Sequence, residues 1–190
     1  MAEIIDIVDK NGIPTGETVA REVAHEQGIR HRTSHVWLLR HREGTLQVLL
    51  QKRSPDKDSF PNQWDISSAG HIPAGDDWKE SAIRELSEEL GLTVDENNLI
   101  DAGLYRISAN DVFHGKSFHD RQVSRIFLLF SDLDESAFKI QKEELSEIRW
   151  FDLDAVIADV RIGKSGECLE ADELEIVRER AKLYYGNSLV

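Results

Sequence analysis

The sequence of 190 residues contains a single cysteine, Cys168, so an intrachain disulfide is excluded. One free thiol suits a reducing compartment, and we expect a cytoplasmic protein. Long apolar runs are also missing: the longest spans residues 126–130, and the N-terminus has neither a basic stretch nor an extended apolar one. A membrane span needs about 20 apolar residues, so we expect no membrane segment and no signal peptide.

Positive charge is scarce as well. Lys and Arg number 23 against 36 Asp and Glu, which gives a formal net charge of −13. Nucleic-acid binding takes much of its free energy from clustered basic residues, so this balance argues against a nucleic-acid polymer as partner. An anionic small molecule would need a metal ion or a few placed basic side chains to overcome the field of the chain. We therefore expect a small-molecule ligand; monomer and homodimer both stay open.

Several catalytic signatures are absent. The sequence has no G-x-S-x-G, no H-E-x-x-H, no C-x-x-C and no G-x-x-x-x-G-K-[ST]. These absences exclude the nucleophile elbow of α/β-hydrolases, the zinc-protease pair, the dithiol redox pair and the P-loop. No repeat or low-complexity linker divides the chain, and a hydrophobic content of 40% is enough for one sizeable core.

Hydrophobic periodicity predicts a mixture of strands and helices. Strands are predicted at 3–8, 17–21, 35–39, 45–51, 99–107, 122–130 and 146–151, with a short extended segment at 64–67; helices are predicted at 77–90, 152–162 and 170–184. The rest of 53–75 is rich in Ser, Pro, Asp and Gly and is typical of a loop. These elements predict an α+β fold in which helices pack on a mixed β-sheet, preceded by an N-terminal hairpin.

The helix at 77–90 carries an acidic cluster. At about 100° per residue, Leu86 and Leu90 lie on one face, and Glu85, Glu88 and Glu89 lie on the other. Carboxylates within one turn repel one another, and a hard divalent cation such as Mg²⁺ or Mn²⁺ would relieve that repulsion. A solvated acidic face is the alternative interpretation, and three glutamates alone do not decide between the two.

The surrounding spacing is more specific than the glutamates alone. Gly70, Arg84, Glu85, Glu88, Glu89 and Gly91 fit the pattern G-x13-R-E-U-x-E-E-x-G-U, where U is aliphatic. At typical residue usage, chance occurrence of the whole pattern in the chain, with its two aliphatic positions, has a probability on the order of one in a million. The pattern resembles the Nudix box, with Asp76 at a position where that family usually has glutamate.

The resemblance implies a fold, a division of the chain and an activity. The fold would be a Nudix-type α/β/α sandwich. Residues 1–30 would form the N-terminal hairpin extension, 31–165 the Nudix hydrolase domain, and 166–190 a C-terminal helix packed on that domain. The activity would be Mg²⁺-dependent cleavage of a diphosphate bond in a nucleoside diphosphate derivative or another small organic diphosphate, with Mn²⁺ able to replace Mg²⁺.

The same resemblance implies roles for individual residues. Glu85, Glu88 and Glu89 would bind the cations and belong to the catalytic set, and Arg84 would orient a neighbouring carboxylate. Gly70 and Gly91 would shape the loop and the helix end, and Gly70 is included among the substrate-binding positions. Asp76 would keep a carboxylate function with a shorter reach.

Glu144 and Glu147 are candidates for the group that accepts a proton from the attacking water. The acidic run that contains them begins just before a predicted strand, where Nudix enzymes often have an accessory glutamate. The alternative is an exposed loop that happens to be acidic.

Residues 53–71 resemble the corresponding region of the isopentenyl-diphosphate isomerase-like branch of the superfamily. That branch implies Arg53 and Lys57 as diphosphate contacts, and Trp64 is a candidate for lining the pocket. It also has three metal-binding histidines. His25, His31 and His71 occur near the corresponding places, and His71 is included among the metal ligands, while metal binding by all three stays open.

Isomerase activity on isoprenoid diphosphates is the alternative function. The isomerases use a cysteine just before the Gly-His pair and a glutamate on a later strand; here Ala69 and, by approximate placement, Gln122 occupy these positions. The remaining thiol, Cys168, is distant in sequence. Hydrolysis is therefore favoured. A non-catalytic module that senses a diphosphate is a third hypothesis, weakened by the complete acidic signature.

Overall fold

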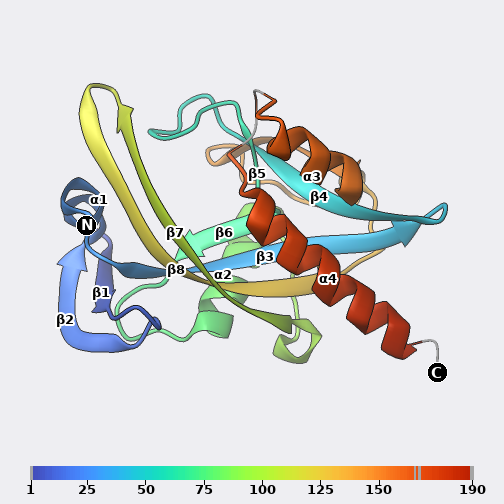
Figure 1. Cartoon of the computed structure of the whole chain (residues 1–190), viewed down its shortest axis with the longest axis horizontal. Coiled ribbons are helices and arrows are strands. Elements are labelled where there is room, and N and C mark those ends of the chain that lie inside the picture. The colour runs from blue at the N-terminus through green and yellow to red at the C-terminus, as the bar shows by residue number, and fades with distance from the viewer. Residues whose placement is uncertain (1, 165, 167, 189–190) are drawn as a thin grey trace.

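The computed structural model describes residues 2–164, 166 and 168–188 (Figure 1). Its strands are β1 (Ile4–Val8), β2 (Pro14–Ala20), β3 (His31–Arg42), β4 (Thr45–Arg53), β5 (Trp64–Asp65), β6 (Ser68–His71), β7 (Ile100–Phe113), β8 (Lys116–Phe130) and β9 (Leu145–Asp152). Its helices are α1 (Arg21–Gln27), α2 (Trp78–Leu90), α3 (Leu153–Arg161) and α4 (Ala171–Ser188). The predicted strands and helices are confirmed, several of them extending further than predicted. α1 and β6 are additional elements, and β6 corrects the prediction that residues 68–71 form a loop.

The strands form two sheets. β1 and β2 pair as an antiparallel hairpin, and the other strands form a mixed sheet in the order β5-β4-β3-β8-β7, with β6 paired to β3 and β9 paired to β4. β3 and β8 run parallel, whereas β3 pairs antiparallel with β4 and with β6. This arrangement confirms the predicted α+β class with a mixed sheet.

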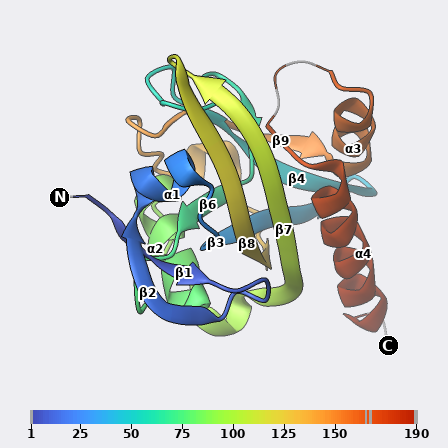
Figure 2. The same ribbon diagram turned by 60° about the vertical axis from the view of Figure 1, so that its left-hand side comes forward.

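β3 is buried on both faces of the sheet. Trp37 and Leu39 pack into a cluster with residues of α3 and α4, whereas Val36 and Leu38 pack into a second cluster with residues of α2. Side chains alternate between the two faces of a strand, so β3 serves both clusters. The result is a layered α/β/α arrangement, with α2 on one side of the sheet and α3 and α4 on the other (Figures 1 and 2).

The N-terminal hairpin is docked on the domain and leads directly into α1. Asp6 accepts a hydrogen bond of 2.8 Å from the buried Arg32 of β3, and Ile5 forms a bridge with Pro73. α1 ends at Gly28, which adopts the left-handed conformation with φ of 67°. Glycine reaches this conformation without the steric cost of a Cβ atom, so the chain can turn there into β3.

β3 and β4 pair with each other near one end and with different strands further along. The two-residue turn at Glu43 and Gly44, both with positive φ, joins them, and they pair only from Leu39 to Arg42. Further along, β3 pairs with β6, and β4 pairs with β5 and β9. β3 and β4 therefore separate, and residues of β3, β4 and β6 line a cavity.

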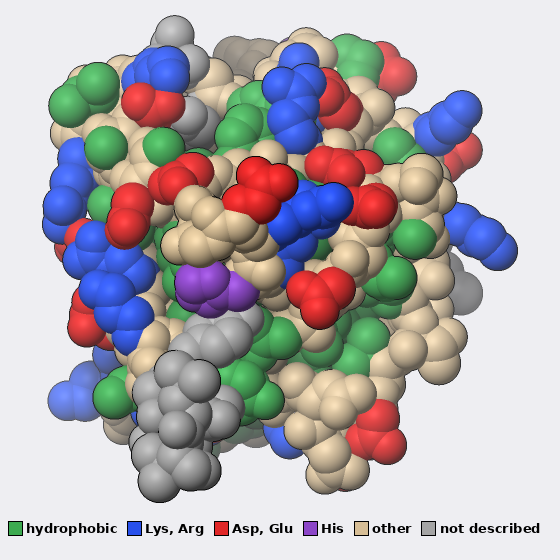
Figure 3. Space-filling view, turned by 90° about the vertical axis from the view of Figure 1, so that its right-hand side faces the viewer, with side chains coloured by type: hydrophobic (Ala, Val, Ile, Leu, Met, Phe, Trp, Pro, Cys, Tyr) green, Lys and Arg blue, Asp and Glu red, His purple; other side chains and the backbone are tan. Residues whose placement is uncertain are grey.

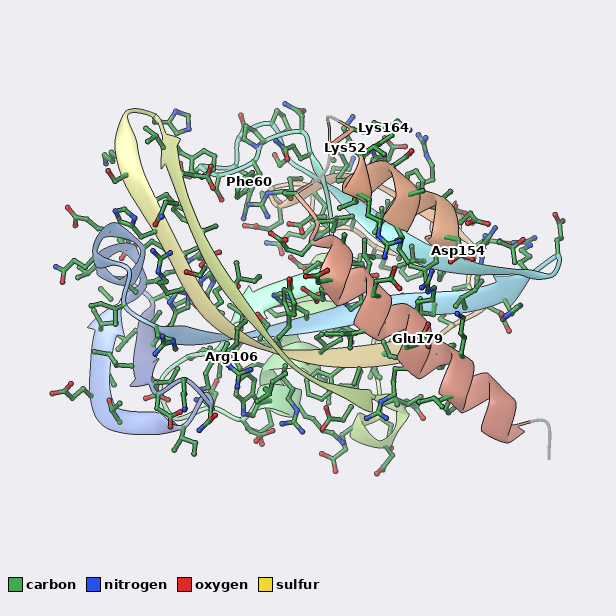
Figure 4. All side chains as sticks on the ribbon, in the orientation of Figure 1. Lys52, Phe60, Arg106, Asp154, Lys164 and Glu179 are labelled. Carbon is green, nitrogen blue, oxygen red and sulfur yellow. The ribbon has the colours of Figure 1, made fainter. Side chains whose placement is uncertain are left out.

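β7 and β8 form a long hairpin that rises past the sheet on the side of α1 (Figure 1). Near its tip, Phe113 makes an edge contact with Phe60, with ring centroids 4.8 Å apart. Phe60 lies in the loop that follows β4 (Figure 4). This aromatic contact joins the hairpin to the loop at one end of the cavity, which Phe60 also lines.

The surface charge is mixed where Figure 3 shows it: acidic and basic side chains lie next to one another over this end of the molecule. Oppositely charged neighbours form ion pairs, such as Arg42 with Asp134 and Arg178 with Asp154. Among the described residues, no helix has the length and apolar character needed to cross a membrane.

Candidate active site

A cavity of about 610 Å³ lies between α2, the split sheet and the loop after β4. Its lining includes Glu85, Glu88 and Glu89 of α2 together with Arg53 and Lys57. Four Lys or Arg side chains and seven Asp or Glu side chains line it in total. The acidic cluster, the predicted diphosphate contacts and a ligand-sized space therefore occur in one place.

The sequence fixes how α2 presents its glutamates. Asp77 caps the N-terminus by accepting a hydrogen bond of 2.9 Å from the Lys79 amide. Gly91, with φ of 67°, ends the helix as predicted, and the Leu92 amide bonds back to the Leu86 carbonyl. Leu86 is fully buried, as are Ala82 and Leu90, so the rotation of the helix about its axis is set by packing.

Glu85 lies between Arg84 and Gly70. Arg84 donates to Glu85 Oε1 at 2.9 Å and to Asp76 Oδ2 at 3.2 Å, which are contacts that an orienting role requires. A Cβ atom at Gly70 would lie only 2.3 Å from the Glu85 carboxyl carbon, so this position has room only for glycine while Glu85 stays in place. Burial raises the pKa of Glu85, against the opposing charge of Arg84.

Glu89 is buried, which corrects the expectation that all three carboxylates lie together on an open face. Its side chain lies against β6, where Ser68 Oγ donates to it at 2.6 Å and the Ala69 amide at 3.3 Å. Burial raises the pKa of Glu89 to about 8, and the nearby charges of Glu85 and Asp65 add to the rise. Helical periodicity alone could not show that β6 covers this part of α2.

These carboxyl groups fit a divalent cation. Glu85 and Glu89 both hold their protons more tightly than ordinary carboxyl groups, because their charged forms are poorly solvated and close to one another. Oxygen-rich sites of this kind are the ones that Mg²⁺ and Mn²⁺ occupy. A cation beside them would supply the missing positive charge, while Glu88 is exposed at the cavity and accessible to it.

The two predicted basic contacts line the cavity, and each is paired with a carboxylate. Arg53 donates to Asp65 Oδ2 at 2.8 Å and to the Ser59 carbonyl at 3.0 Å. Lys57 forms an ion pair with Glu144. Glu144 also lines the cavity.

Two other predicted residues lie elsewhere. Glu147, on β9, pairs with Arg149 and is not among the residues that line this cavity. Trp64 lines a separate, smaller cavity, and its ring packs edge-on against Phe151. Trp64 belongs to β5, and the pairing of β5 with β4 determines where the Trp64 side chain points. The local sequence does not show this long-range pairing. We therefore leave both out of the proposed site.

The histidines implied by the isomerase-like branch come together. The ligating nitrogens of His25, His31 and His71 all lie within 4.8 Å of one another. Burial lowers the pKa of His25 to about 3 and also lowers the pKa values of His31 and His71, so all three are neutral near pH 7. His31 Nε2 and His25 Nδ1 are buried without a hydrogen-bond partner in the described part of the chain. Neutral imidazoles with free nitrogens fit a transition-metal ion.

The positions that isomerase chemistry would use also line the cavity. Ala69 and Gln122 are both there, with a methyl group and an amide in place of a thiol and a carboxylate. Cys168 lines the cavity too, which its distance in sequence did not indicate. Its thiol donates to the Trp64 carbonyl, and burial raises its pKa far above the usual range.

Two further residues at the site carry no local sequence signal. His35 lines the cavity, and its Nδ1 lies 2.8 Å from Glu173 Oε1 of α4. In the sequence, His35 follows the polar residues 31–34 of β3 and precedes the apolar run 36–39. Its glutamate partner is 138 positions away, so only the fold reveals the pair.

Comparison with known sequences identifies relatives over most of the chain. A sequence model of the NUDIX domain matches residues 30–167. Nudix hydrolase 3 from Arabidopsis thaliana is 43% identical over 152 residues, which cover 78% of this chain and 19% of the plant protein. An uncharacterized Nudix hydrolase from Clostridium acetobutylicum is 38% identical over 75% of this chain and 66% of that protein. The chain thus spans about a fifth and about two thirds of these two relatives.

An isopentenyl-diphosphate Delta-isomerase from Aliivibrio fischeri is also similar, at 28% identity over 80% of this chain and 81% of that protein. Among solved structures, DR0079 from Deinococcus radiodurans aligns with a TM-score of 0.65 and 20% identity over 93% of this chain and 98% of its own. The NUDIX domain of Shewanella oneidensis NrtR, complexed with ADP ribose, aligns with a TM-score of 0.58 and 18% identity over 79% of this chain and 87% of its own. These structures share the fold.

Proposed function

This chain belongs to the NUDIX domain family, and from that premise we propose that it is a hydrolase that cleaves the diphosphate bond of a small organic diphosphate with the help of Mg²⁺. The observation that carries the proposal is the meeting of Glu85, Glu88 and Glu89 with Arg53 and Lys57 in one cavity. Metal-binding groups and phosphate-binding groups are both needed for this reaction, and here they face the same space.

The proposed division of labour follows from the contacts. Glu85, Glu88 and Glu89 would hold the divalent cation, and Arg84 would keep Glu85 in position through their hydrogen bond. When bound, the cation would neutralise charge on the diphosphate and lower the pKa of the attacking water.

On the substrate side, diphosphate oxygens would displace Asp65 from Arg53 and Glu144 from Lys57. The two basic side chains would then donate hydrogen bonds to the diphosphate. Glu144, released from Lys57 in this way, would accept a proton from the attacking water. His71 with His25 and His31 would hold a second metal ion beside the same cavity, which His25 and His71 line.

The test is metal-dependent hydrolysis across a panel of nucleoside diphosphate esters, dinucleoside polyphosphates and prenyl diphosphates. Glu88→Gln removes one charged ligand from an exposed position, so the fold should persist while kcat/KM falls by at least about 10²-fold. Glu80→Gln is the matched control, because Glu80 is an exposed glutamate of the same helix outside the cavity. Equal turnover by the two variants would refute the proposal.

The isomerase alternative gains one observation, the position of Cys168 in the cavity. Incubation with isopentenyl diphosphate, followed by analysis for dimethylallyl diphosphate, separates the two functions. We expect no isomer, since neither Ala69 nor Gln122 can move a proton to or from carbon. Isomer formation that is lost in Cys168→Ala would favour the alternative. Ligand binding without turnover of any substrate would instead favour the sensor.

A further inference from the structure

Glu173 is a buried carboxylate outside the stretch that the NUDIX model matches. It lies on α4, which packs against β7, β8 and α3, and the residue is only 1% exposed. Its Oε1 atom accepts hydrogen bonds from His35 Nδ1 at 2.8 Å and from Trp37 Nε1 at 2.9 Å. A buried carboxylate is costly unless such donors hold it, so these two contacts explain how Glu173 is tolerated.

Glu173 fixes the orientation of the His35 ring. Glu173 Oε1 already accepts from the Trp37 indole, so it serves as an acceptor, and Nδ1 of His35 is assigned the hydrogen and faces α4. The opposite ring nitrogen, Nε2, lies 3.4 Å from Thr33 Oγ1, longer than an ordinary hydrogen bond. Thr33 Oγ1 is already engaged with Ser124 at 2.8 Å and with Gln122 at 3.1 Å. Nε2 is therefore weakly bound and available to a ligand.

The cavity wall near His35 is polar. Thr33, His35 and Gln122 all line the cavity, and so does Gln51 of β4. Gln51 is only 2% exposed, and its Oε1 atom has no hydrogen-bond partner among the described residues. A hydrocarbon placed against this wall would leave both Gln51 Oε1 and His35 Nε2 without good partners.

A hydroxyl group suits both atoms. It can donate to Gln51 Oε1, and it can either accept from or donate to His35 Nε2, whichever protonation state the ring has. Burial alone would lower the pKa of His35, but the charge and the hydrogen bond of Glu173 outweigh burial and raise it, with Asp65 and Asp120 adding to the rise. Glu173 therefore favours the charged ring, in which both nitrogens carry a hydrogen and Nε2 is a donor, more than an isolated imidazole would.

We propose that this wall binds a hydroxylated group attached to the diphosphate, that His35 is the contact that selects it, and that Glu173 is the residue that positions His35. The inference rests on the proposed diphosphate hydrolysis, because it names the class of substrate for that same cavity. It also gives the C-terminal helix a part in specificity, although α4 contributes no metal ligand.

The test compares two diphosphate monoesters of similar size, ribose 5-diphosphate and n-pentyl diphosphate. Their dissociation constants are measured by calorimetry with Ca²⁺ as the cation, so that binding is read whether or not the chain hydrolyses them. The wild type should prefer the ribose ester by about 10²-fold, since sites built around hydroxyl groups reject analogues that lack them. Equal affinities, or no binding of either ester, would overturn the inference.

Variants separate selection from mere folding. In His35→Leu the preference should fall to within a few-fold of unity, whereas His35→Gln, which keeps a hydrogen-bonding amide, should retain part of it. Glu173→Gln should reduce the preference while leaving the Mg²⁺ concentration for half-maximal hydrolysis unchanged. A preference that stays intact in both His35→Gln and Glu173→Gln while the proteins remain folded would contradict the assigned roles. If preference is found but no ester is hydrolysed, the proposed function fails and the subsite stands.

Discussion

Gly70→Ala tests whether the position of the Glu85 carboxylate matters. Gly70 lies in β6, paired with Ser34 of β3, and its φ is not positive, so alanine can adopt the backbone conformation. The added methyl group would lie 2.3 Å from the carboxyl carbon of Glu85 and 2.6 Å from its Cγ atom. The backbone of the strand can therefore hold alanine at this position, but the added methyl group overlaps the side chain of Glu85.

The size of the effect follows from that overlap. Ordinary contacts begin near 3.4 Å, so the Glu85 carboxylate must move by roughly 1 Å. A misplacement of this size at a catalytic group costs about 10²-fold in rate, or about 2.7 kcal/mol in transition-state free energy. Stability should change less, because a flexible side chain yields first; a rotamer strain of about 1 kcal/mol corresponds to a loss of about 2–4 °C in Tm.

The assay is kcat/KM at saturating Mg²⁺, together with a Mg²⁺ titration and a thermal melt. We expect kcat/KM to fall about 10²-fold and the Mg²⁺ requirement to rise, with a nearly native Tm. Because the methyl group acts through Glu85, adding Gly70→Ala to Glu85→Gln should produce little further loss. Full activity in Gly70→Ala, or fully additive losses in the double variant, would refute this reasoning.

Two further predictions concern buried groups. In EDTA, folded Glu89 keeps its proton up to a pKa of about 8, whereas the unfolded group loses it near 4.5, so the stability contributed by this group falls as pH rises between those values. The difference in free energy of unfolding between Glu89→Gln and the wild type should therefore shift in favour of the variant by up to about 2.7 kcal/mol from pH 6 to pH 8. If denaturant titrations give the two proteins the same pH dependence of this free energy, the burial of Glu89 would be contradicted. Burial and the neighbouring Asp65 hold the pKa of Cys168 far above its usual range, so iodoacetamide should alkylate the native protein at pH 8 at least about 100-fold more slowly than the urea-unfolded protein. Similar rates would show an open thiol.

The features that the sequence predicts well are those with local causes. The end of α2 at Gly91 depends on one residue that adopts a left-handed conformation cheaply. β3 is readable for a similar reason: a run of apolar residues around Trp37 is typical of a strand that is buried on both faces. Such signals survive without knowledge of the rest of the fold.

The features that it predicts poorly depend on strand pairing. Glu89 is buried because β6 lies over it, and β6 is placed there by its pairing with Thr33 to Val36 of β3. Trp64 and Cys168 illustrate the same limit in opposite directions: the tryptophan expected at the pocket lies outside it, and the thiol expected elsewhere lies inside. A helix face or a distance along the chain does not contain this information.

The charges of the cavity predict that cation and diphosphate bind cooperatively. Acidic side chains outnumber basic ones there, and Arg53, Lys57 and Arg84 are each already paired with a carboxylate. A diphosphate arriving alone must break these pairs against a net negative field, whereas a cation held by Glu85 weakens the hold of that carboxylate on Arg84 and offsets most of the negative charge. At equal concentrations of the free anion, pyrophosphate should therefore bind about 10- to 100-fold more tightly with Mg²⁺ than in EDTA, and Mg²⁺ should gain by the same factor from pyrophosphate. Equal affinity in the two conditions would mean that the paired basic groups alone attract the substrate, and the acidic cluster would then need another explanation.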